Sequence, residues 1–154
     1  MRNIMKSINT EITINASTEI VWKVLMDFEN YSNWNPFVTR IEGEPVVGQK
    51  LSTTISPKGK KPMDFTPTVL ATDENEEFRW VGQLLMSGIF DGEHYFQLEA
   101  IDKNTTRFIH GEIFRGILAR ALFGILEEST ITGFNDMNEA IKAKAEHQAQ
   151  SKAA

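Results

Sequence analysis

The sequence lacks cysteine altogether, and this absence removes several kinds of chemistry at once. Disulfide bridges, thiolate metal sites and thiol nucleophiles all depend on the cysteine sulfur. Histidine is scarce too, because only His94, His110 and His147 occur in the chain. A metal cage rich in imidazole groups is therefore excluded, and each histidine is worth placing in the fold.

Long apolar runs are also missing. No stretch approaches the roughly 18 apolar residues of a membrane-spanning helix, and Met1 to Lys6 lack the apolar centre of a signal peptide. The net charge is −5 and the basic residues are scattered, which argues against a nucleic-acid surface. We expect a cytoplasmic protein that neither inserts into membranes nor binds nucleic acid. Without a glycine-rich phosphate loop, no cofactor is expected either.

The chain of 154 residues has the length of one domain with a real core. Phenylalanine is abundant, with ten copies against two tyrosines, and three tryptophans add more rigid apolar surface. We expect residues 1–148 to form a single ligand-binding domain and residues 149–154 to be a frayed tail.

The longest uninterrupted pattern runs from Gly116 to about His147 and predicts one C-terminal helix. Its predicted apolar face consists of Ala119, Leu122, Phe123, Leu126, Thr130, Gly133, Phe134, Met137, Ala140 and Ile141. Its predicted polar face consists of Arg120, Glu127, Glu128, Asn135, Asn138, Glu139 and Lys142. The apolar face is thin around Ser129, Thr130 and Gly133, which predicts a close backbone approach or open space there, with close packing as the alternative.

The rest of the chain is dominated by strand patterns with a period of two. Residues 7–14 alternate as a half-buried strand, and Ser17 or Thr18 can cap a helix that ends near Glu29. Further strands are predicted at 38–43, 49–56, 63–73, 77–84, 89–101 and 105–115. The predicted fold class is α+β: a seven-stranded curved antiparallel sheet wrapped around the C-terminal helix, with two short helices after the first strand.

Strand alternation also predicts which side chains meet the helix, because the aromatic side of each strand should face inward. The inward set and the helix together predict a ligand cavity lined by Phe65, Val69, Trp80, Phe90, His94, Phe96, His110, Glu112, Phe114, Leu122, Leu126 and Thr130. Trp34 and Phe37 either guard its mouth or pack within their own surface loop.

The turn at Asp102 to Asn104 predicts the register of the last two strands. A three-residue loop with Asn104 in the left-handed conformation would pair Ile101 with Thr105. Counting back from there places Phe96 opposite His110 and His94 opposite Glu112, all on the inner face.

Three roles are open for this inner polar group. His94 and Glu112 can act as an acid–base pair, or His94, His110 and Glu112 can bind a metal ion as two imidazoles and a carboxylate. Alternatively, the three side chains simply satisfy one another's hydrogen bonds in a partly wet cavity.

Several segments resemble the bacterial polyketide cyclase/dehydrase and lipid-transport group of the START-like (SRPBCC) superfamily, which also includes the birch-pollen-allergen fold. The resemblance covers roughly residues 5 to 146. It is carried by Trp22-Lys23-Val24-Leu25, Trp34-Asn35-Pro36-Phe37, Phe65-Thr66-Pro67-Thr68-Val69-Leu70, Phe78-Arg79-Trp80, Gly92-Glu93-His94-Tyr95-Phe96 and Thr106-Arg107-Phe108-Ile109-His110-Gly111-Glu112-Ile113-Phe114. It implies a helix-grip fold that encloses a cavity for an apolar small molecule, and it supplies no shared catalytic residue.

The expected function is binding of a lipid-like, sterol-like or polyketide-like molecule, as a carrier or a sensor. The alternative is a cyclase or dehydratase in which His94 removes a proton and Glu112 sets its tautomer. Whether the protein is an enzyme stays open at this point, and either a monomer or a homodimer is compatible with the sequence.

Overall fold

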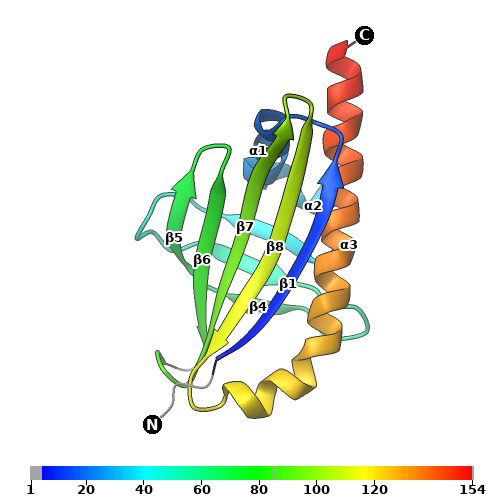
Figure 1. The fold of residues 1–154 in the computed structure, drawn as a ribbon. Helices are drawn as coiled ribbons and strands as arrows, with labels where there is room; N and C mark the ends of the chain where they lie inside the picture. The colour runs from blue at the N-terminus through cyan, green and yellow to red at the C-terminus, as the bar shows by residue number, and fades with distance from the viewer. Residues whose placement is uncertain (1–4, 85, 154) are drawn as a thin grey trace.

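The computed structural model of the protein describes residues 5–84 and 86–153. A curved antiparallel sheet and a long C-terminal helix pack against each other (Figure 1). The chain begins with β1 (Lys6–Ile14), α1 (Thr18–Met26), the 3-10 turn η1 (Phe28–Asn30) and α2 (Tyr31–Trp34). It continues with β2 (Val38–Glu42), β3 (Ser52–Ile55), β4 (Met63–Phe65), β5 (Thr68–Asp73), β6 (Glu77–Leu84), β7 (Phe90–Asp102), β8 (Thr105–Arg115) and α3 (Ala119–Ala153). The predicted fold class is confirmed.

The described residues form eight strands rather than the predicted seven, because the expected strand 63–73 is divided into β4 and β5. The break falls at Pro67, which has no N–H to donate to a neighbouring strand. The described strands form a five-stranded sheet, in the order β1-β8-β7-β6-β5, and a three-stranded sheet, β2-β3-β4. The backbone N–H of Leu51 donates to the Pro67 carbonyl at 2.9 Å and so joins the two sheets beside the break.

The register of β7 and β8 is as predicted over most of its length, since His94 pairs with Glu112 and Phe96 with His110. The predicted turn is wrong: Asp102, not Ile101, pairs with Thr105, and a bulge between Ala100 and Asp102 takes up the extra residue. Asn104 is not left-handed, and its N–H donates to Asp102 Oδ1 at 2.8 Å. The bulge compensates for the shorter turn, which is why the inward-facing pairs are unchanged.

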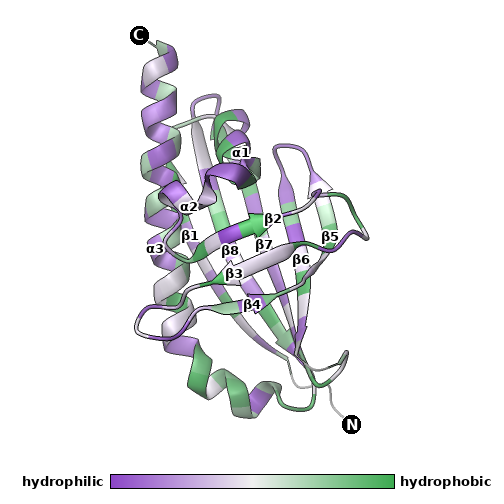
Figure 2. Ribbon diagram, turned by 180° about the vertical axis from the view of Figure 1, so that it is seen from behind, coloured by the Kyte–Doolittle hydropathy of each residue, from purple (hydrophilic) through white to green (hydrophobic). Residues whose placement is uncertain are grey.

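The C-terminal helix begins at Ala119 rather than Gly116, because Gly116 has a φ of 119° that no right-handed helix contains. Its first turns, yellow in Figure 1, run across the end of the sheet, and the remainder runs along β1. These first turns are mostly apolar, whereas the later part of α3 is mostly hydrophilic (Figure 2). The helix continues through residues 149–153, where the sequence predicts a frayed tail.

The thin part of the helix face is filled by a side chain from another segment. Phe37 is 4% exposed, and a Cβ atom at Gly133 would clash with its ring. Asn35 holds Phe37 in place, because its Oδ1 accepts hydrogen bonds from the N–H groups of Phe37 and Val38 at 3.0 and 2.9 Å. Of the predicted alternatives at Gly133, close packing is the one observed, and Phe37 is a core residue rather than a guard at a cavity mouth.

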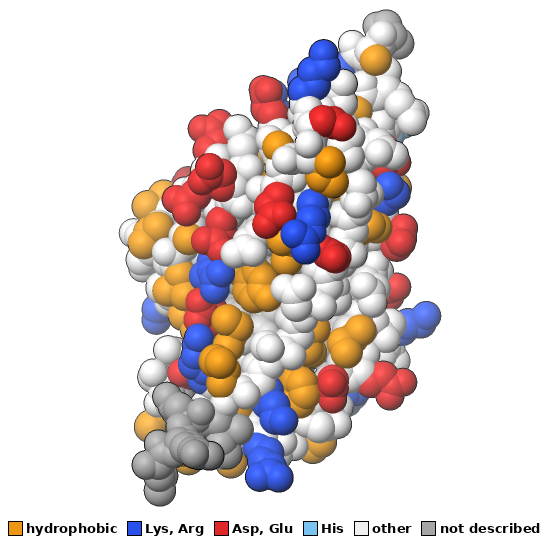
Figure 3. All heavy atoms as spheres, in the orientation of Figure 1, with side chains coloured by type: hydrophobic (Ala, Val, Ile, Leu, Met, Phe, Trp, Pro, Cys, Tyr) orange, Lys and Arg blue, Asp and Glu red, His pale blue; other side chains and the backbone are white. Residues whose placement is uncertain are grey.

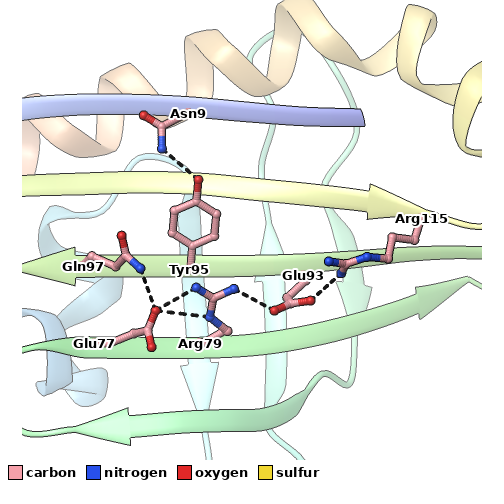
Figure 4. A network of polar contacts seen from close by, with 7 residues as sticks. All are labelled: Asn9, Glu77, Arg79, Glu93, Tyr95, Gln97 and Arg115. Carbon is pink, nitrogen blue, oxygen red and sulfur yellow. Dashed lines mark hydrogen bonds and ion pairs between the residues drawn. The ribbon is translucent and has the colours of Figure 1, made fainter. Parts of the chain in front are cut away.

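The outer face of the sheet carries a network of half-buried polar side chains (Figure 4). Arg79 donates to Glu77 at 2.8 Å and to Glu93 at 2.7 Å, and Glu93 also accepts from Arg115. The Tyr95 hydroxyl accepts a hydrogen bond from Asn9 Nδ2 at 2.8 Å. This outward polar set leaves the aromatic side chains to the inner face, as the strand alternation predicts.

Charges of both signs are interspersed over the face shown in Figure 3, with apolar side chains between them. Within residues 5–84 and 86–153, no helix combines the length and the apolar character needed to cross a membrane.

Candidate functional site

The inner face of β6, β7 and β8 holds both buried histidines within a cluster of aromatic rings. His94 is 1% exposed and its ring stacks on Trp80, with 4.8 Å between ring centroids. His110 is fully buried and stacks on Phe134 of α3 at 4.0 Å. The sheet and the helix therefore clamp the two imidazoles between large apolar rings.

The two histidines belong to one hydrogen-bonded series that crosses from the sheet to α3. The Nε2 atoms of His94 and His110 lie 2.7 Å apart, and His110 Nδ1 lies 2.9 Å from Asn138 Oδ1. Asn138 Nδ2 donates to Thr10 Oγ1 at 2.9 Å, and the Thr10 hydroxyl donates to the His110 carbonyl at 2.8 Å. Apart from His94 Nδ1, each side-chain polar atom in this series has a hydrogen-bonding partner.

Glu112 lies beside His94, at the end of the hydrogen-bonded series that is opposite Thr10. Its Oε2 lies 3.8 Å from His94 Nδ1, which is too long for a direct hydrogen bond. A Cβ atom at Gly92 would clash with Glu112 Oε1, so the carboxyl group lies directly over that glycine. The Glu112 side chain is 17% exposed, which makes it the accessible member of the pair.

Burial determines the protonation of these groups. It lowers the pKa of His94 well below 6.5, with a further lowering by neighbouring His110. Burial also lowers the pKa of His110 to about 3, although its hydrogen bonds to Asn138 and to the Phe134 backbone favour the charged form. Burial raises the pKa of Glu112 to about 8. At neutral pH all three groups are uncharged, so the His94–Glu112 contact is not an ion pair.

The structure divides the predicted lining residues into two groups. Val69, Trp80, Phe96, His110 and Phe114 are buried in the packed core together with His94. The half-buried members are Phe65, Phe90, Glu112, Leu122, Leu126 and Thr130. Among them, Phe90 stacks on Phe114, which also contacts the half-buried Phe123 at 5.7 Å between ring centroids. The half-buried rings of Phe90 and Phe123 therefore both contact Phe114, close to the start of α3.

Two hollows occur elsewhere on the described surface. One, of about 370 Å³, is lined by Lys58, Lys60, Ile125, Glu128, Ser129 and Thr132. The other, of about 720 Å³, is lined by Phe28, Glu29, Ser32, Thr39, Arg40, Ile41, Glu42, Gly43 and Glu44. Neither contains a residue of the predicted cavity, so these hollows are separate from the group around Glu112.

The geometry does not favour the metal-binding alternative. Metal ligands point their lone pairs at one common point, whereas the Nε2 atoms of His94 and His110 face each other across a hydrogen bond. Among the described residues, no three histidine, aspartate or glutamate side chains are grouped as a metal site.

Asn138 and Thr10 were missed by sequence reasoning. Asn138 is 1% exposed, although the predicted helical wheel places it on the polar face. A signal was present, because Asn138 follows Phe134 by one helical turn and precedes Ile141 by another, and both neighbours are fully buried. A polar residue between two such core positions indicates a buried hydrogen bond rather than a solvated face.

The curved antiparallel sheet, the two short helices after β1 and the long C-terminal helix packed on the sheet define a helix-grip fold. The chain belongs to the family described as polyketide cyclase / dehydrase and lipid transport, which it matches over residues 5–146. None of the curated proteins matches the sequence.

Solved structures share the fold at low sequence identity. The Zhui aromatase/cyclase from Streptomyces sp. R1128 is 16% identical, with a TM-score of 0.72 over 94% of this chain and 96% of that one. A point mutant of norcoclaurine synthase from Thalictrum flavum, in complex with a transition-state analogue, is 17% identical, with a TM-score of 0.73 over 96% and 99%. The same synthase in complex with dopamine and hydroxybenzaldehyde is 16% identical, with a TM-score of 0.69 over 92% and 86%.

Proposed function

We propose that the protein binds a small hydrophobic or amphipathic molecule between the sheet and α3, as a carrier or a sensor. The observation that carries the proposal is a pair of glycines, Gly82 and Gly92, that lie opposite each other on β6 and β7. The Phe65 ring lies over Gly82, and the Glu112 carboxyl lies over Gly92. An apolar ring and one uncharged polar group, both half-buried, are the elements of a small-molecule site.

The ligand chemistry follows from these two groups. Apolar surface for a ring or an acyl body is available on Phe65, Phe90, Leu122 and Leu126. Glu112 in its protonated form offers a hydrogen-bond donor for one hydroxyl, keto or carboxyl group. The complex of norcoclaurine synthase with dopamine and hydroxybenzaldehyde supports a ring-bearing ligand, because that enzyme places small aromatic molecules in the same fold.

A charge placed inside this region should disrupt binding far more than the same charge outside it. Leu126 is half-buried, whereas its neighbour Ile125 is 68% exposed on the same helix. Quenching of tryptophan fluorescence by a panel of fatty acids, sterols, flavonoids and aromatic polyketides should be saturable for the wild type. We expect Leu126→Arg to weaken that binding by about tenfold or more, because the new charge would be buried without a partner.

Ile125→Arg is the matched control and should bind within about twofold of the wild type. If no compound in the panel gives a saturable signal, the binding proposal is wrong. If Ile125→Arg rather than Leu126→Arg abolishes binding, the ligand occupies the outer hollow beside Lys60 instead of the region around Glu112.

A second candidate function, dehydration by a cyclase-like enzyme, is favoured by the protonation of the His94–Glu112 pair. A neutral carboxylic acid beside a neutral imidazole supplies one acid and one base at the same place. In the elimination of water from a β-hydroxyacyl thioester, His94 Nδ1 would take the α-proton while Glu112 gives its proton to the leaving hydroxyl. The imidazolium then returns a proton to Glu112, and the site is restored.

The two functions differ in what the loss of Glu112 should do. For an enzyme acting on β-hydroxyacyl thioesters, Glu112→Gln should lower turnover by ~10²–10⁴ while affinity stays within a few-fold. For a carrier, no turnover is present at the outset, and the same substitution changes affinity alone. Formation of the α,β-unsaturated thioester, followed by absorbance, separates these outcomes.

A further inference from the structure

In the hydrogen-bonded series from Thr10 to His94, each donor and each acceptor can be assigned, starting from Thr10. The Thr10 hydroxyl carries one proton and donates it to the His110 carbonyl, which can only accept. Toward Asn138, the Thr10 oxygen must therefore be the acceptor, and the group 2.9 Å away must be the NH₂ of Asn138. This fixes the orientation of the amide and turns its oxygen toward His110.

The orientation of Asn138 then determines the proton of each histidine. An amide oxygen carries no proton, so His110 Nδ1, 2.9 Å away, must donate to it. A neutral imidazole has one N–H, and His110 Nε2 is consequently bare and accepts from His94 Nε2 at 2.7 Å. His94 is neutral as well, which leaves its Nδ1 bare and directed toward Glu112.

We infer that Thr10, Asn138 and His110 are positioning residues that hold the proton of His94 on Nε2, so that Glu112 is the group of this site that presents a proton to a ligand. The role of Glu112 toward a ligand rests on the proposed function. The arrangement of protons does not, because it belongs to the ligand-free protein. A bare imidazole nitrogen beside Glu112 favours the carboxylic acid over the carboxylate, since a carboxylate there would find no donor.

Few other charges face the Glu112 carboxyl. β7 contributes His94, with His110 of β8 behind it, and β6 contributes Trp80 and Gly82. From β1, Lys6 lies on the same side of the sheet, with its Nζ 5.7 Å from the centre of the Phe123 ring of α3. The ion pairs of Arg79 and Arg115 lie on the opposite face (Figure 4). The histidine series is therefore the polar system that borders the carboxyl group.

The proton positions can be observed directly in ligand-free protein. Long-range ¹H–¹⁵N spectra of histidine-labelled protein at neutral pH distinguish the two neutral tautomers from each other and from the charged ring. We expect His110 to be protonated on Nδ1 and His94 on Nε2. The signals that disappear in His147→Gln belong to His147, and the signals that remain belong to the two buried rings. A spectrum with His94 protonated on Nδ1, or with either buried ring charged, overturns the inference.

Two substitutions of His110 test whether the series controls Glu112. In His110→Gln, the amide NH₂ can donate to Asn138 while the amide oxygen accepts from His94, so the direction is preserved. In His110→Leu, His94 has no acceptor at Nε2, and its proton should move to Nδ1, where an N–H that faces Glu112 favours the carboxylate. The midpoint of the Glu112 titration, followed by the ¹³C shift of its carboxyl, should be about 8 in the wild type and in His110→Gln. It should fall by about one pH unit or more in His110→Leu.

Equal midpoints in the two variants would refute the positioning role. If His110→Leu does not fold, the wild-type spectrum still decides, because the tautomers are read there without any substitution. A protein that shows these tautomers but binds no compound would contradict the proposed function and leave the proton arrangement standing.

Discussion

Glutamine in place of Glu112 is expected to make the protein more stable than the wild type in mildly alkaline solution. Burial raises the pKa of Glu112 from 4.5 to about 8 in the folded protein. The folded state therefore keeps a proton that the unfolded chain has already released. The stabilisation from this proton is complete below pH 4.5. It decreases by about 1.4 kcal/mol per pH unit as the pH rises from 4.5, and it is lost once the pH has passed about 8.

The buried histidines act in the opposite direction on the acid side. Burial lowers the pKa of His94 well below 6.5 and that of His110 to about 3. As the pH falls below 6.5, the unfolded chain binds protons at these positions and the folded protein does not, so stability decreases. The free energy of unfolding should therefore be greatest near pH 6.5 and decline on both sides.

Urea unfolding from acidic to alkaline pH, for the wild type and Glu112→Gln, measures this curve. The alkaline decline should disappear in the variant, while the acid decline remains. Glu93→Gln is the matched control on the opposite face of the sheet, where the hydrogen bonds and charges of Arg79 and Arg115 lower the pKa of Glu93 despite its partial burial. That change should reduce stability in alkaline solution. An alkaline decline of unchanged slope in Glu112→Gln would show that another group causes it.

Alanine at two glycines of α3 should have effects of opposite sign. An interior glycine costs a helix about 1 kcal/mol relative to alanine. At Gly124 a Cβ atom meets nothing within 4 Å, so Gly124→Ala should raise the free energy of unfolding by up to about 1 kcal/mol. At Gly133 the same atom clashes with the Phe37 ring, and Gly133→Ala should lower the free energy of unfolding by about 1–3 kcal/mol.

The comparison is informative because both positions lie in the same helix and receive the same methyl group. Chemical unfolding gives both values, and near-ultraviolet circular dichroism reports whether the aromatic packing around Phe134 changes. A stabilising effect of Gly133→Ala would mean that the Phe37 ring moves aside readily and that the side chains between α3 and Phe37 can repack.

The register around Glu112 could be predicted from the sequence because it depends on local rules. Alternation places His94, His110 and Glu112 on one face, and an incorrect turn was harmless because a bulge before Asp102 restored the pairing. The division of strand 63–73 was also within reach, since Pro67 stands where a donor would be needed.

The side chains that fill the space between the sheet and α3 could not be predicted from such local rules. Whether Gly133 adjoins a void or a ring depends on Phe37, which lies far away in the sequence and reaches α3 only through the tertiary fold. Asn138 was assigned to solvent because a helical wheel ranks polar residues by their average behaviour. Its partner Thr10 is 128 positions away, and no local pattern predicts that pairing.

The bulge between Ala100 and Asp102 also separates the length of the β7–β8 turn from the chemistry farther down the same strands. The irregular step absorbs a one-residue difference between the two strands at that tip, without turning His94 or Glu112 toward the outside. We therefore expect the exposed hairpin to tolerate a one-residue change in turn length, while the inward-facing row keeps its order.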